Sequence, residues 1–320
     1  MGCGLIGHKR ARALRNACVV CCCDPVEDRA RSLASRCPGA NATADWEMAV
    51  RRDDVDLVIV ATTHHALAAI AAEAARNGKH VLVEKPGACR AAELEPVGEE
   101  AARARVRVRV GFNHRYHRAF RKAREIFASG ALGEMMFIRA RYGHGGRAGY
   151  SQEWRANPEL SGGGELLDQG IHLIDLARCF LGDFTRVHGK VATYFWNTPV
   201  EDNAFLLLET ARGQMAFLHA SWTEWKNLFS FEIAGRNGKL EISGLGGSYG
   251  VERLTHYRML PEMGPPETTC WEYPMEDDSW EHEFREFLDD IALGHDPSPG
   301  IGDAQAALRV VEAVYRENGL

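Results

Sequence analysis

The chain has 320 residues, 45% of them hydrophobic and 26% charged, a composition typical of a soluble globular protein with about two domains. Its formal net charge of −6 argues against nucleic-acid binding, which usually needs a basic surface. The sequence contains no apolar run long enough to span a membrane, and no apolar segment follows its basic N-terminal residues as in a secretory signal. We therefore expect a cytoplasmic protein with no nucleic-acid or membrane partner.

Nine cysteines are present, and three of them, Cys21, Cys22 and Cys23, are consecutive. In a chain without an export signal we expect reduced thiols rather than disulfides. Consecutive residues of a strand point to opposite faces, so this run cannot converge on one ion. We predict no metal site.

The chain opens with Gly2, Gly4 and Gly7, which spell the dinucleotide-binding pattern G-x-G-x-x-G. A helix from about His8 would present its unpaired N–H groups and positive dipole end to a pyrophosphate. The strand that should precede the glycines is represented by Met1 alone. Loss of this central strand would leave two neighbouring strands without ladder partners and open an apolar gap. We expect the natural reading frame to start upstream and supply a strand of about 5 to 6 residues, or this start to be a truncation.

The first third of the sequence alternates short apolar runs with stretches rich in Ala, Arg and Glu. The predicted strands cover 18–23, 57–61 and 81–83, and the predicted helices cover 26–36, 45–52 and 65–77. This alternation predicts βαβ units and a parallel sheet buried on both faces. Val106, Val108 and Val110 alternate with arginines, which favours a further strand with one face less buried.

After about residue 113 the pattern changes to consecutive strands joined by short turns. The predicted helices cover 117–129, 164–181, 279–293 and 303–318, and the predicted strands cover 135–142, 186–196, 203–210, 214–223, 228–234 and 239–243. Asn237-Gly238 predicts the hairpin before the last strand. The aromatic and proline-rich segment 249–274 could shape a larger pocket or an interface.

We predict an α/β protein of two domains. Residues 1–113 would form a Rossmann domain, a doubly wound parallel sheet whose first strand is missing. Residues 114–320 would form a substrate-binding and oligomerisation domain with an open, mostly antiparallel sheet, and its C-terminal helix could pack back on the first domain.

Asp24 lies 20 residues after Gly4, at the end of the second predicted strand. An acidic residue at this position binds the ribose hydroxyls of a dinucleotide. Its carboxylate would also repel a 2′-phosphate, which favours NAD over NADP. The alternative is that Asp24-Pro25 is simply a turn that ends the strand.

Glu84-Lys85-Pro86 follows a predicted parallel strand, at the sheet edge where open α/β sheets bind ligands. A lysine at this edge could bond a substrate hydroxyl or carbonyl. The alternative is a surface Lys-Pro turn.

A polar stripe runs along the predicted apolar helix after Gly164. At 100° per residue, Asp168, His172, Asp175 and Cys179 fall within about 60° of one another. Histidine titrates near neutrality, so His172 could take a proton from an alcohol while a hydride leaves the same carbon. Asp168 could orient the imidazole or bind substrate. A satisfied core histidine is the alternative, and a metal site would need a third ligand that the sequence does not place.

Several short motifs occur in one order along nearly the whole chain. They are Gly2-Cys-Gly-Leu-Ile-Gly7, Asp24-Pro25, Ala61-Thr62-Thr63-His64, Gly78-Lys-His-Val-Leu-Val-Glu-Lys-Pro86, Gly111-Phe112-Asn113-His114-Arg115 and Gly162-Gly-Gly-x-x-x-Asp168-x-Gly170-x-His172-x-x-Asp175. In these motifs the chain resembles the glucose–fructose oxidoreductase / inositol 2-dehydrogenase (Gfo/Idh/MocA) family. The resemblance implies a Rossmann domain, a C-terminal sheet that often mediates oligomers, here a homodimer or homotetramer, and a nicotinamide cofactor.

The resemblance also implies roles for individual residues. Lys85 would contact the reacting oxygen, His172 would be the general base, and Asp168 would bind the substrate beside it. The implied cofactor-binding residues are Gly2, Gly4, Leu5, Ile6, Gly7, Asp24, Thr62, His64, Glu84, Lys85 and Asn113. The implied substrate-binding residues are Lys85, Asn113, Trp154, Arg155, Asp168 and His172.

The expected activity is hydride transfer between NAD(P), with NAD preferred, and a hydroxyl-bearing carbon of a sugar, polyol or nucleotide sugar. Two alternatives stay open: a non-enzymatic regulator that binds a dinucleotide on the same fold, and an enzyme that uses tightly bound NAD transiently. The sequence leaves open the particular substrate, the direction of the reaction and the oligomeric state.

Overall fold

The computed structural model describes residues 1–320. By its contacts the chain divides into two compact units. Unit 1 comprises Met1–Asn113, Glu159–Gly162 and Trp280–Leu308. Unit 2 comprises His114–Pro158, Gly163–Ser279 and Arg309–Leu320. No helix is both long enough and apolar enough to cross a bilayer.

Unit 1 alternates helices and parallel strands, which confirms the predicted βαβ pattern. Its helices are α1 (Leu5–Ala13), α2 (Glu27–Ala34), α3 (Trp46–Val50), α4 (His64–Arg76), α5 (Glu95–Ala104) and α9 (Ser279–Leu293). Its strands are β1 (Cys21–Cys23), β2 (Asn41–Thr43), β3 (Leu57–Val60), β4 (His80–Glu84) and β5 (Val108–Gly111). The apolar residues of β4 are fully buried, as expected for a strand covered on both faces.

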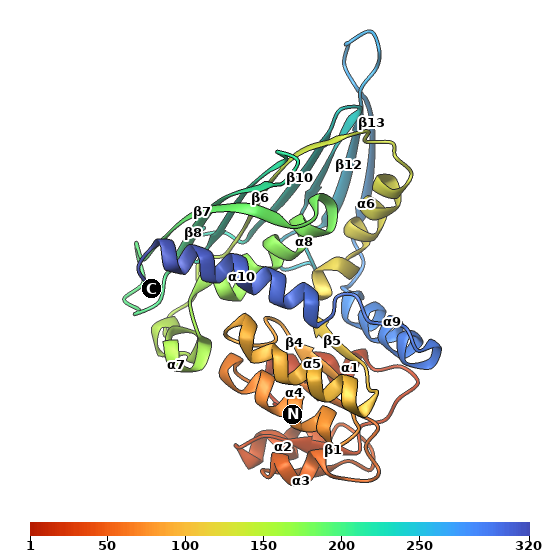
Figure 1. The fold of residues 1–320 in the computed structure, drawn as a ribbon, viewed down its shortest axis with the longest axis vertical. Coiled ribbons are helices and arrows are strands. Elements are labelled where there is room, and N and C mark those ends of the chain that lie inside the picture. The colour runs from red at the N-terminus through yellow and green to blue at the C-terminus, as the bar shows by residue number, and fades with distance from the viewer. The chain divides into compact units, whose positions relative to one another are not determined.

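The parallel strands of unit 1 form two separate sheets. One has the order β1-β2 and the other the order β3-β4-β5, and every pair in them is parallel. In Figure 1 the helices α4 and α5 lie over β4 and β5. The sheet is interrupted between β1 and β3, where the first strand of a doubly wound sheet would lie.

The prediction that β5 has one less buried face is wrong. Arg109, on that face, is fully buried, because its guanidinium forms ion pairs with Glu286 at 3.2 Å and Asp290 at 2.5 Å. Both carboxylates come from α9. Buried charges are tolerated where they are paired in this way.

Unit 2 is built on one eight-stranded sheet with the order β13-β12-β11-β10-β6-β9-β8-β7. Its strands are β6 (Met135–Gly143), β7 (Phe184–Ala192), β8 (Asn203–Thr210), β9 (Met215–Ser221), β10 (Leu228–Gly235), β11 (Gly238–Ser243), β12 (Glu252–Arg258) and β13 (Glu267–Tyr273). All neighbouring pairs are antiparallel except β6 and β9, so the predicted mostly antiparallel sheet is confirmed. The segment 249–274 contributes the edge hairpin β12–β13.

Helices cover one face of this sheet (Figure 1). They are α6 (Arg118–Ala128), α8 (Ile171–Leu181) and the C-terminal part of α10 (Ile301–Glu317). The short helix α7 (Pro158–Ser161) and α10 each contribute residues to both units. The predicted hairpin before β11 forms, with its turn at Arg236 and Asn237, one residue earlier than predicted.

Candidate active site

The glycine loop at the start of the chain packs tightly against its own backbone. A Cβ on Gly2, whose φ is +81°, would lie 2.3 Å from the Ala61 carbonyl oxygen, and one on Gly7 would lie 2.1 Å from the Gly2 carbonyl oxygen. A Cβ on Gly4 would meet no atom within 4 Å. No side chain caps the N-terminus of α1, which begins at Leu5. An uncapped helix start behind open space at a glycine fits a dinucleotide pyrophosphate.

Alanine substitutions at Gly7 and Gly4 are therefore expected to have different effects. Gly7→Ala is expected to lower the melting temperature, because its methyl group collides with backbone. Gly4→Ala is expected to leave the melting temperature unchanged and to weaken NAD binding at least about tenfold, because the methyl group would occupy the space a pyrophosphate needs. Thermal melting and calorimetric NAD titration measure the two effects, and equal NAD affinity of Gly4→Ala and the wild type would contradict the assignment.

Asp24 follows β1 and ties the glycine loop to the end of that strand. Its carboxylate accepts hydrogen bonds from the N–H of Cys3 at 2.8 Å and the N–H of Val26 at 2.9 Å. Asp24 is buried, and each of its oxygens keeps a second lone pair for another donor. The carboxylate thus shapes the loop, and its role toward a ribose stays a prediction.

The residues after β3 and β5 begin the next elements of unit 1. Thr62 lies in the connection between β3 and α4, and His64 is the first residue of α4. The His64 Nδ1 lies 2.8 Å from the Ser161 carbonyl oxygen, which fixes the ring. Asn113 is buried directly after β5. Their predicted places beside the nicotinamide are untested.

Glu84 ends β4 and forms a buried ion pair with Arg10 of α1 at 2.5 Å. Arg10 also pairs with Glu283 of α9, so one guanidinium serves two buried carboxylates. A Cβ on Gly111 would lie 2.6 Å from an Arg10 nitrogen, which explains the glycine there. This network fixes the backbone immediately before Lys85.

Glu283 predicts a pH dependence of stability. Burial raises its pKa from 4.5 to about 7, and the neighbouring charge of Glu84 adds to this effect. Between pH 4.5 and about pH 7 the folded protein holds a proton on Glu283 that the unfolded chain releases. The free energy of unfolding therefore falls as the pH rises through this range. A shift of this size corresponds to about 3 kcal/mol. Glu283→Gln is expected to remove this fall in the free energy of unfolding, measured by urea unfolding between about pH 5 and about pH 8. The control Glu281→Gln alters a surface ion pair and should retain the fall.

The last two residues of the triple glycine, Gly163 and Gly164, belong to unit 2 and allow a close approach of Tyr315 and Glu201. A Cβ on Gly164 would lie 2.1 Å from the Glu201 carbonyl oxygen, and one on Gly163 would lie 2.1 Å from the Tyr315 hydroxyl. The Glu201 carboxylate accepts from the N–H groups of Gly164 at 3.0 Å and Leu166 at 3.1 Å, and from the Tyr315 hydroxyl at 2.7 Å. Glu201 therefore satisfies the N–H groups at the start of the helical segment that carries Asp168 and His172.

That helical segment is not uniform. Residues Leu166–Gly170 form a π-helical turn, and α8 follows from Ile171. The sequence predicts one continuous α-helix here, and the structure differs from that prediction by the wider π-helical turn. Single π turns inside helices occur frequently at functional sites, and this one carries Asp168.

Asp168 and His172 are both buried in unit 2. The Asp168 carboxylate accepts a hydrogen bond from the Arg155 Nε at 2.8 Å, and the Arg155 guanidinium stacks over the Trp154 ring at 4.7 Å. The His172 ring stacks on His114, with the centroids 3.7 Å apart and the planes at 18°. The predicted residues Trp154, Arg155 and Asp168 therefore form one contiguous group.

Tyr142 on β6 presents its edge to His172, with the ring centroids 6.4 Å apart, and its ring contacts Tyr249 at 5.1 Å. Burial raises the pKa of Tyr142 well above its ordinary value and raises the pKa of Tyr249 to about 12. Both hydroxyls therefore stay protonated at physiological pH, and the Tyr142 ring lies beside His172.

Asp175, on the same predicted polar stripe as Asp168, has a different environment. Its carboxylate makes two bonds with Arg115, at 2.8 Å and 2.5 Å, and both residues are buried. Asp175 is thus neutralised by a structural ion pair. Cys179 is half-buried, farther along α8.

The structure adds residues that the sequence analysis did not single out: His114, Tyr142, Glu201 and Tyr249. His114 lay within a quoted motif, and Tyr142 occupies an inward position of β6, whose burial alternates along most of the strand. Their roles depend on contacts between distant segments. Of the predicted catalytic residues, Asp168 and His172 lie in unit 2 and Lys85 lies in unit 1.

Comparison with known proteins identifies the class. Residues 1–112 match the family described as "Oxidoreductase family, NAD-binding Rossmann fold", and residues 120–241 match the "GFO/IDH/MocA C-terminal domain". The chain belongs to this family of NAD-binding oxidoreductases, which confirms the resemblance and the α/β fold.

Particular relatives are dehydrogenases. Levoglucosan dehydrogenase of Pseudarthrobacter phenanthrenivorans is 31% identical over 58% of this chain, and the match spans 48% of that protein's length. Myo-inositol 2-dehydrogenase of Thermotoga maritima is 24% identical over 96% of this chain and 92% of its own length. The solved structure of GenD2 from gentamicin A biosynthesis, in complex with NAD, is 26% identical, with a TM-score of 0.84 over 98% of this chain and 91% of that chain.

Proposed function

We propose that this protein is an NAD-dependent dehydrogenase that oxidises a hydroxyl-bearing carbon of a sugar, polyol or nucleotide sugar, or reduces the corresponding carbonyl. The observation that carries the proposal is the buried His172, held by the ring of His114, on the same helical segment as an Asp168 that Arg155 orients. The named activities of the levoglucosan and inositol dehydrogenases support the substrate class.

The proposed residues divide the chemistry among them. His172 takes the proton of the reacting hydroxyl, or returns it in the reverse direction. Lys85 donates a hydrogen bond to the same oxygen and stabilises its developing negative charge. Asp168 accepts a hydrogen bond from a neighbouring substrate hydroxyl, and Trp154, Arg155 and Asn113 complete the substrate site.

The cofactor would be held by Gly2, Gly4, Leu5, Ile6, Gly7, Asp24, Thr62, His64, Glu84, Lys85 and Asn113. The nicotinamide, when bound, accepts or supplies the hydride. A buried carboxylate at Asp24 favours NAD over NADP, because it would repel a 2′-phosphate.

We also propose a cytoplasmic homodimer or homotetramer. Nine free cysteines support a reducing compartment. Leu207 and Phe217, neighbours across β8 and β9, are about half exposed on the sheet face that the helices leave open, which supports association through this sheet. Analytical ultracentrifugation tests the oligomeric state, and a monomer at micromolar concentration would contradict it.

A cofactor-reduction screen tests the function. The protein is incubated with NAD or NADP and with free sugars, including levoglucosan, inositols and nucleotide sugars, while reduced nicotinamide is followed by its absorbance. We expect reduction of NAD by at least one of these compounds, with a higher kcat/KM for NAD than for NADP. Tight NAD binding without turnover of any compound would favour the regulator, and substrate conversion without net reduction would favour transient use of NAD.

A further inference from the structure

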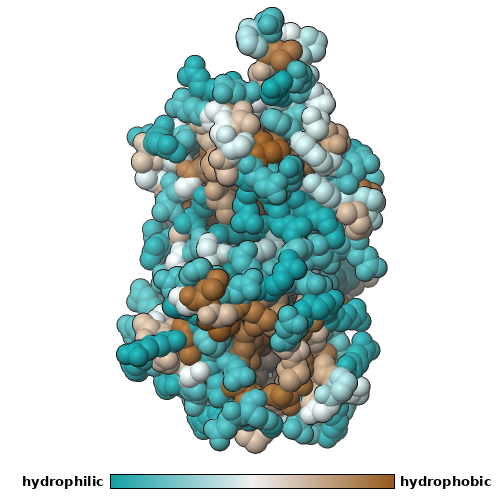
Figure 2. Space-filling model, turned by 90° about the vertical axis from the view of Figure 1, so that its right-hand side faces the viewer, coloured by the Kyte–Doolittle hydropathy of each residue, from teal (hydrophilic) through white to brown (hydrophobic).

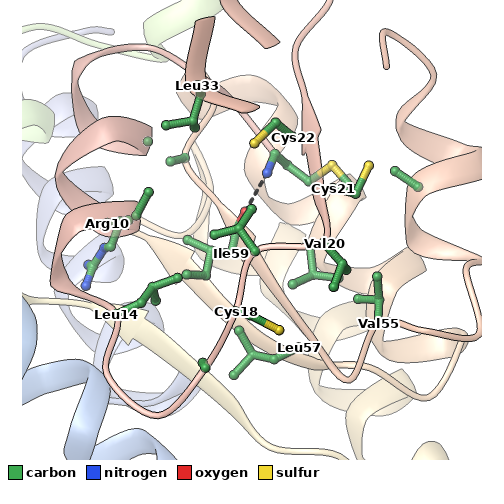
Figure 3. Close-up of a pocket in the computed structure, with 18 of the residues that line it drawn as sticks. Arg10, Leu14, Cys18, Val20, Cys21, Cys22, Leu33, Val55, Leu57 and Ile59 are labelled. Atoms are coloured by element: carbon green, nitrogen blue, oxygen red, sulfur yellow. Dashed lines mark hydrogen bonds between the residues drawn. The ribbon is translucent and has the colours of Figure 1, made fainter. Parts of the chain in front are cut away.

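An apolar cavity in unit 1 belongs to the interrupted sheet of that unit. It has a volume of about 420 Å³, and its lining includes Leu57 and Ile59 of β3 and Cys22 of β1. Figure 3 shows these three residues around the space, and Figure 2 shows hydrophobic residues around a hollow in the lower half of the molecule. Open α/β sheets bind ligands at the carboxyl ends of their strands rather than between the strands. We therefore assign no ligand to this cavity.

Unit 2 carries an exposed aromatic surface on the connections that follow β7 and β9. It consists of Phe195, in the connection after β7, and Trp225, in the connection after β9. These residues are 55% and 71% exposed, and their rings meet edge to face with the centroids 4.8 Å apart. Large aromatic side chains gain much from burial, so an exposed pair of this kind indicates a surface that another molecule covers.

The backbone holds this aromatic surface in place. The buried carboxylate of Asp202 accepts hydrogen bonds from three consecutive N–H groups, those of Tyr194 at 2.9 Å, Phe195 at 2.8 Å and Trp196 at 3.0 Å. Trp225 has a φ of +48°, a left-handed conformation that residues other than glycine rarely adopt. Backbone strain of this kind is concentrated at functional sites. A surface fixed in advance also loses less conformational entropy when it binds a ligand.

A row of rings leads from the aromatic surface toward the substrate residues of unit 2. Phe195 contacts the Trp196 ring with the centroids 5.2 Å apart, and Trp196 contacts the buried Tyr150 ring at 5.7 Å. Burial raises the pKa of Tyr150 well above its ordinary value, and the negative charge of Asp168 adds to this effect. Tyr150, at the inner end of the row, therefore lies within electrostatic reach of Asp168.

Ion pairs make the same connection. The Arg147 guanidinium lies over the Tyr150 ring at 5.6 Å and pairs with Glu153 at 2.6 Å. Glu153 also lies 3.8 Å from the guanidinium of Arg155, whose Nε donates to the Asp168 carboxylate at 2.8 Å. The aromatic surface and the proposed substrate residues Arg155 and Asp168 therefore belong to one connected part of unit 2.

We propose that the aromatic surface of Phe195 and Trp225 is a subsite for a second sugar ring, so that the preferred substrate is a glycoside of at least two rings. The C–H faces of a pyranose ring are apolar and would pack on the aromatic rings, while its hydroxyl groups stay in water. A neutral ring suits this surface better than the diphosphate of a nucleotide sugar, because the guanidinium of Arg147 is already paired with Glu153. This inference rests on the proposed dehydrogenase function.

Sugar binding tests the subsite directly. The protein, with and without NADH, is titrated calorimetrically with maltose, cellobiose and lactose, and with glucose and galactose. We expect at least one disaccharide to bind, and Trp225→Ala and Phe195→Ala each to weaken that binding at least about tenfold without changing the affinity for monosaccharides. Trp225→Phe should retain most of the affinity for the disaccharide, because it keeps an aromatic face.

Met263→Ala is the matched control. Met263 is 79% exposed, lies in the same unit and also has a positive φ, of +57°. This variant should bind and oxidise each sugar as the wild type does.

Turnover separates this inference from the proposed function. With NAD as oxidant, we expect kcat/KM to be higher for the best disaccharide than for its component monosaccharide, and Trp225→Ala to bring this ratio close to one. If no sugar reduces NAD but a disaccharide still binds in a manner that depends on Trp225, the dehydrogenase function is wrong and the sugar subsite stands.

Three results would overturn the subsite. The first is the absence of disaccharide binding, or equal disaccharide affinity of Trp225→Ala and the wild type. The second is binding of UDP-glucose that is tighter than that of any disaccharide and is lost in Trp225→Ala, which would indicate stacking of a base. The third is dissociation of a dimer by Trp225→Ala with unchanged sugar affinity, measured by analytical ultracentrifugation, which would indicate a contact between copies of the chain.

Discussion

Replacing His172 with alanine is expected to lower kcat by about 10²- to 10⁴-fold, the usual contribution of a general base. The imidazole is buried, its ring orientation is fixed by the stack on His114, and Asp168 lies one turn before it on the same helical segment. Lys85→Ala should give a loss of similar size, because the developing charge on the reacting oxygen would lose its donor.

The readout separates a catalytic role from a packing role. His172→Asn retains a polar side chain of moderate size, and His188→Ala removes a mostly exposed histidine from the same unit. Melting temperature and NAD affinity should be nearly unchanged in His172→Asn, while kcat falls as in His172→Ala and stays normal in His188→Ala. If turnover survives in both Lys85→Ala and His172→Ala, the assignment of roles is wrong.

Replacing Asp175 with alanine is expected to lower the free energy of unfolding by about 3 to 5 kcal/mol, the usual cost of breaking a buried ion pair. Both partners are buried, and the loss of the carboxylate would remove the group that two nitrogens of the Arg115 guanidinium bind. Urea unfolding followed by circular dichroism measures the change.

The neighbouring ion pair between Arg178 and Asp183 provides a matched control, since the Asp183 carboxylate is largely exposed. Asp183→Ala should lower the free energy of unfolding by no more than about 1 kcal/mol, as for other surface pairs. An equal cost for Asp175→Ala and Asp183→Ala would show that burial of the Arg115 pair adds nothing to stability.

Local patterns were enough to predict most elements of the fold. The apolar run at Val81–Val83 predicts a strand buried on both faces, and β4 is such a strand. The alternation at Val106–Val110 misleads, because local pattern cannot show that Arg109 meets Glu286 and Asp290 from a helix far along the chain. The hairpin β12–β13 was missed, since its segment is rich in proline and glycine that resemble loop composition.

The sequence indicates which residue types could form the candidate site, but it does not reveal the contacts that those residues make. Helical spacing places Asp168, His172 and Asp175 on one face, yet only contacts from other segments reveal that Arg155 binds the first and Arg115 the third.

The most direct test of the proposed reaction is isotope transfer. The best substrate of the screen is deuterated at its carbinol carbon and incubated with NAD and the protein, and the reduced cofactor is analysed by mass spectrometry. We predict one deuterium in the reduced nicotinamide ring for each substrate molecule oxidised, with none lost to water. Release of the deuterium to solvent, or oxidation of substrate without label in the cofactor, would contradict hydride transfer.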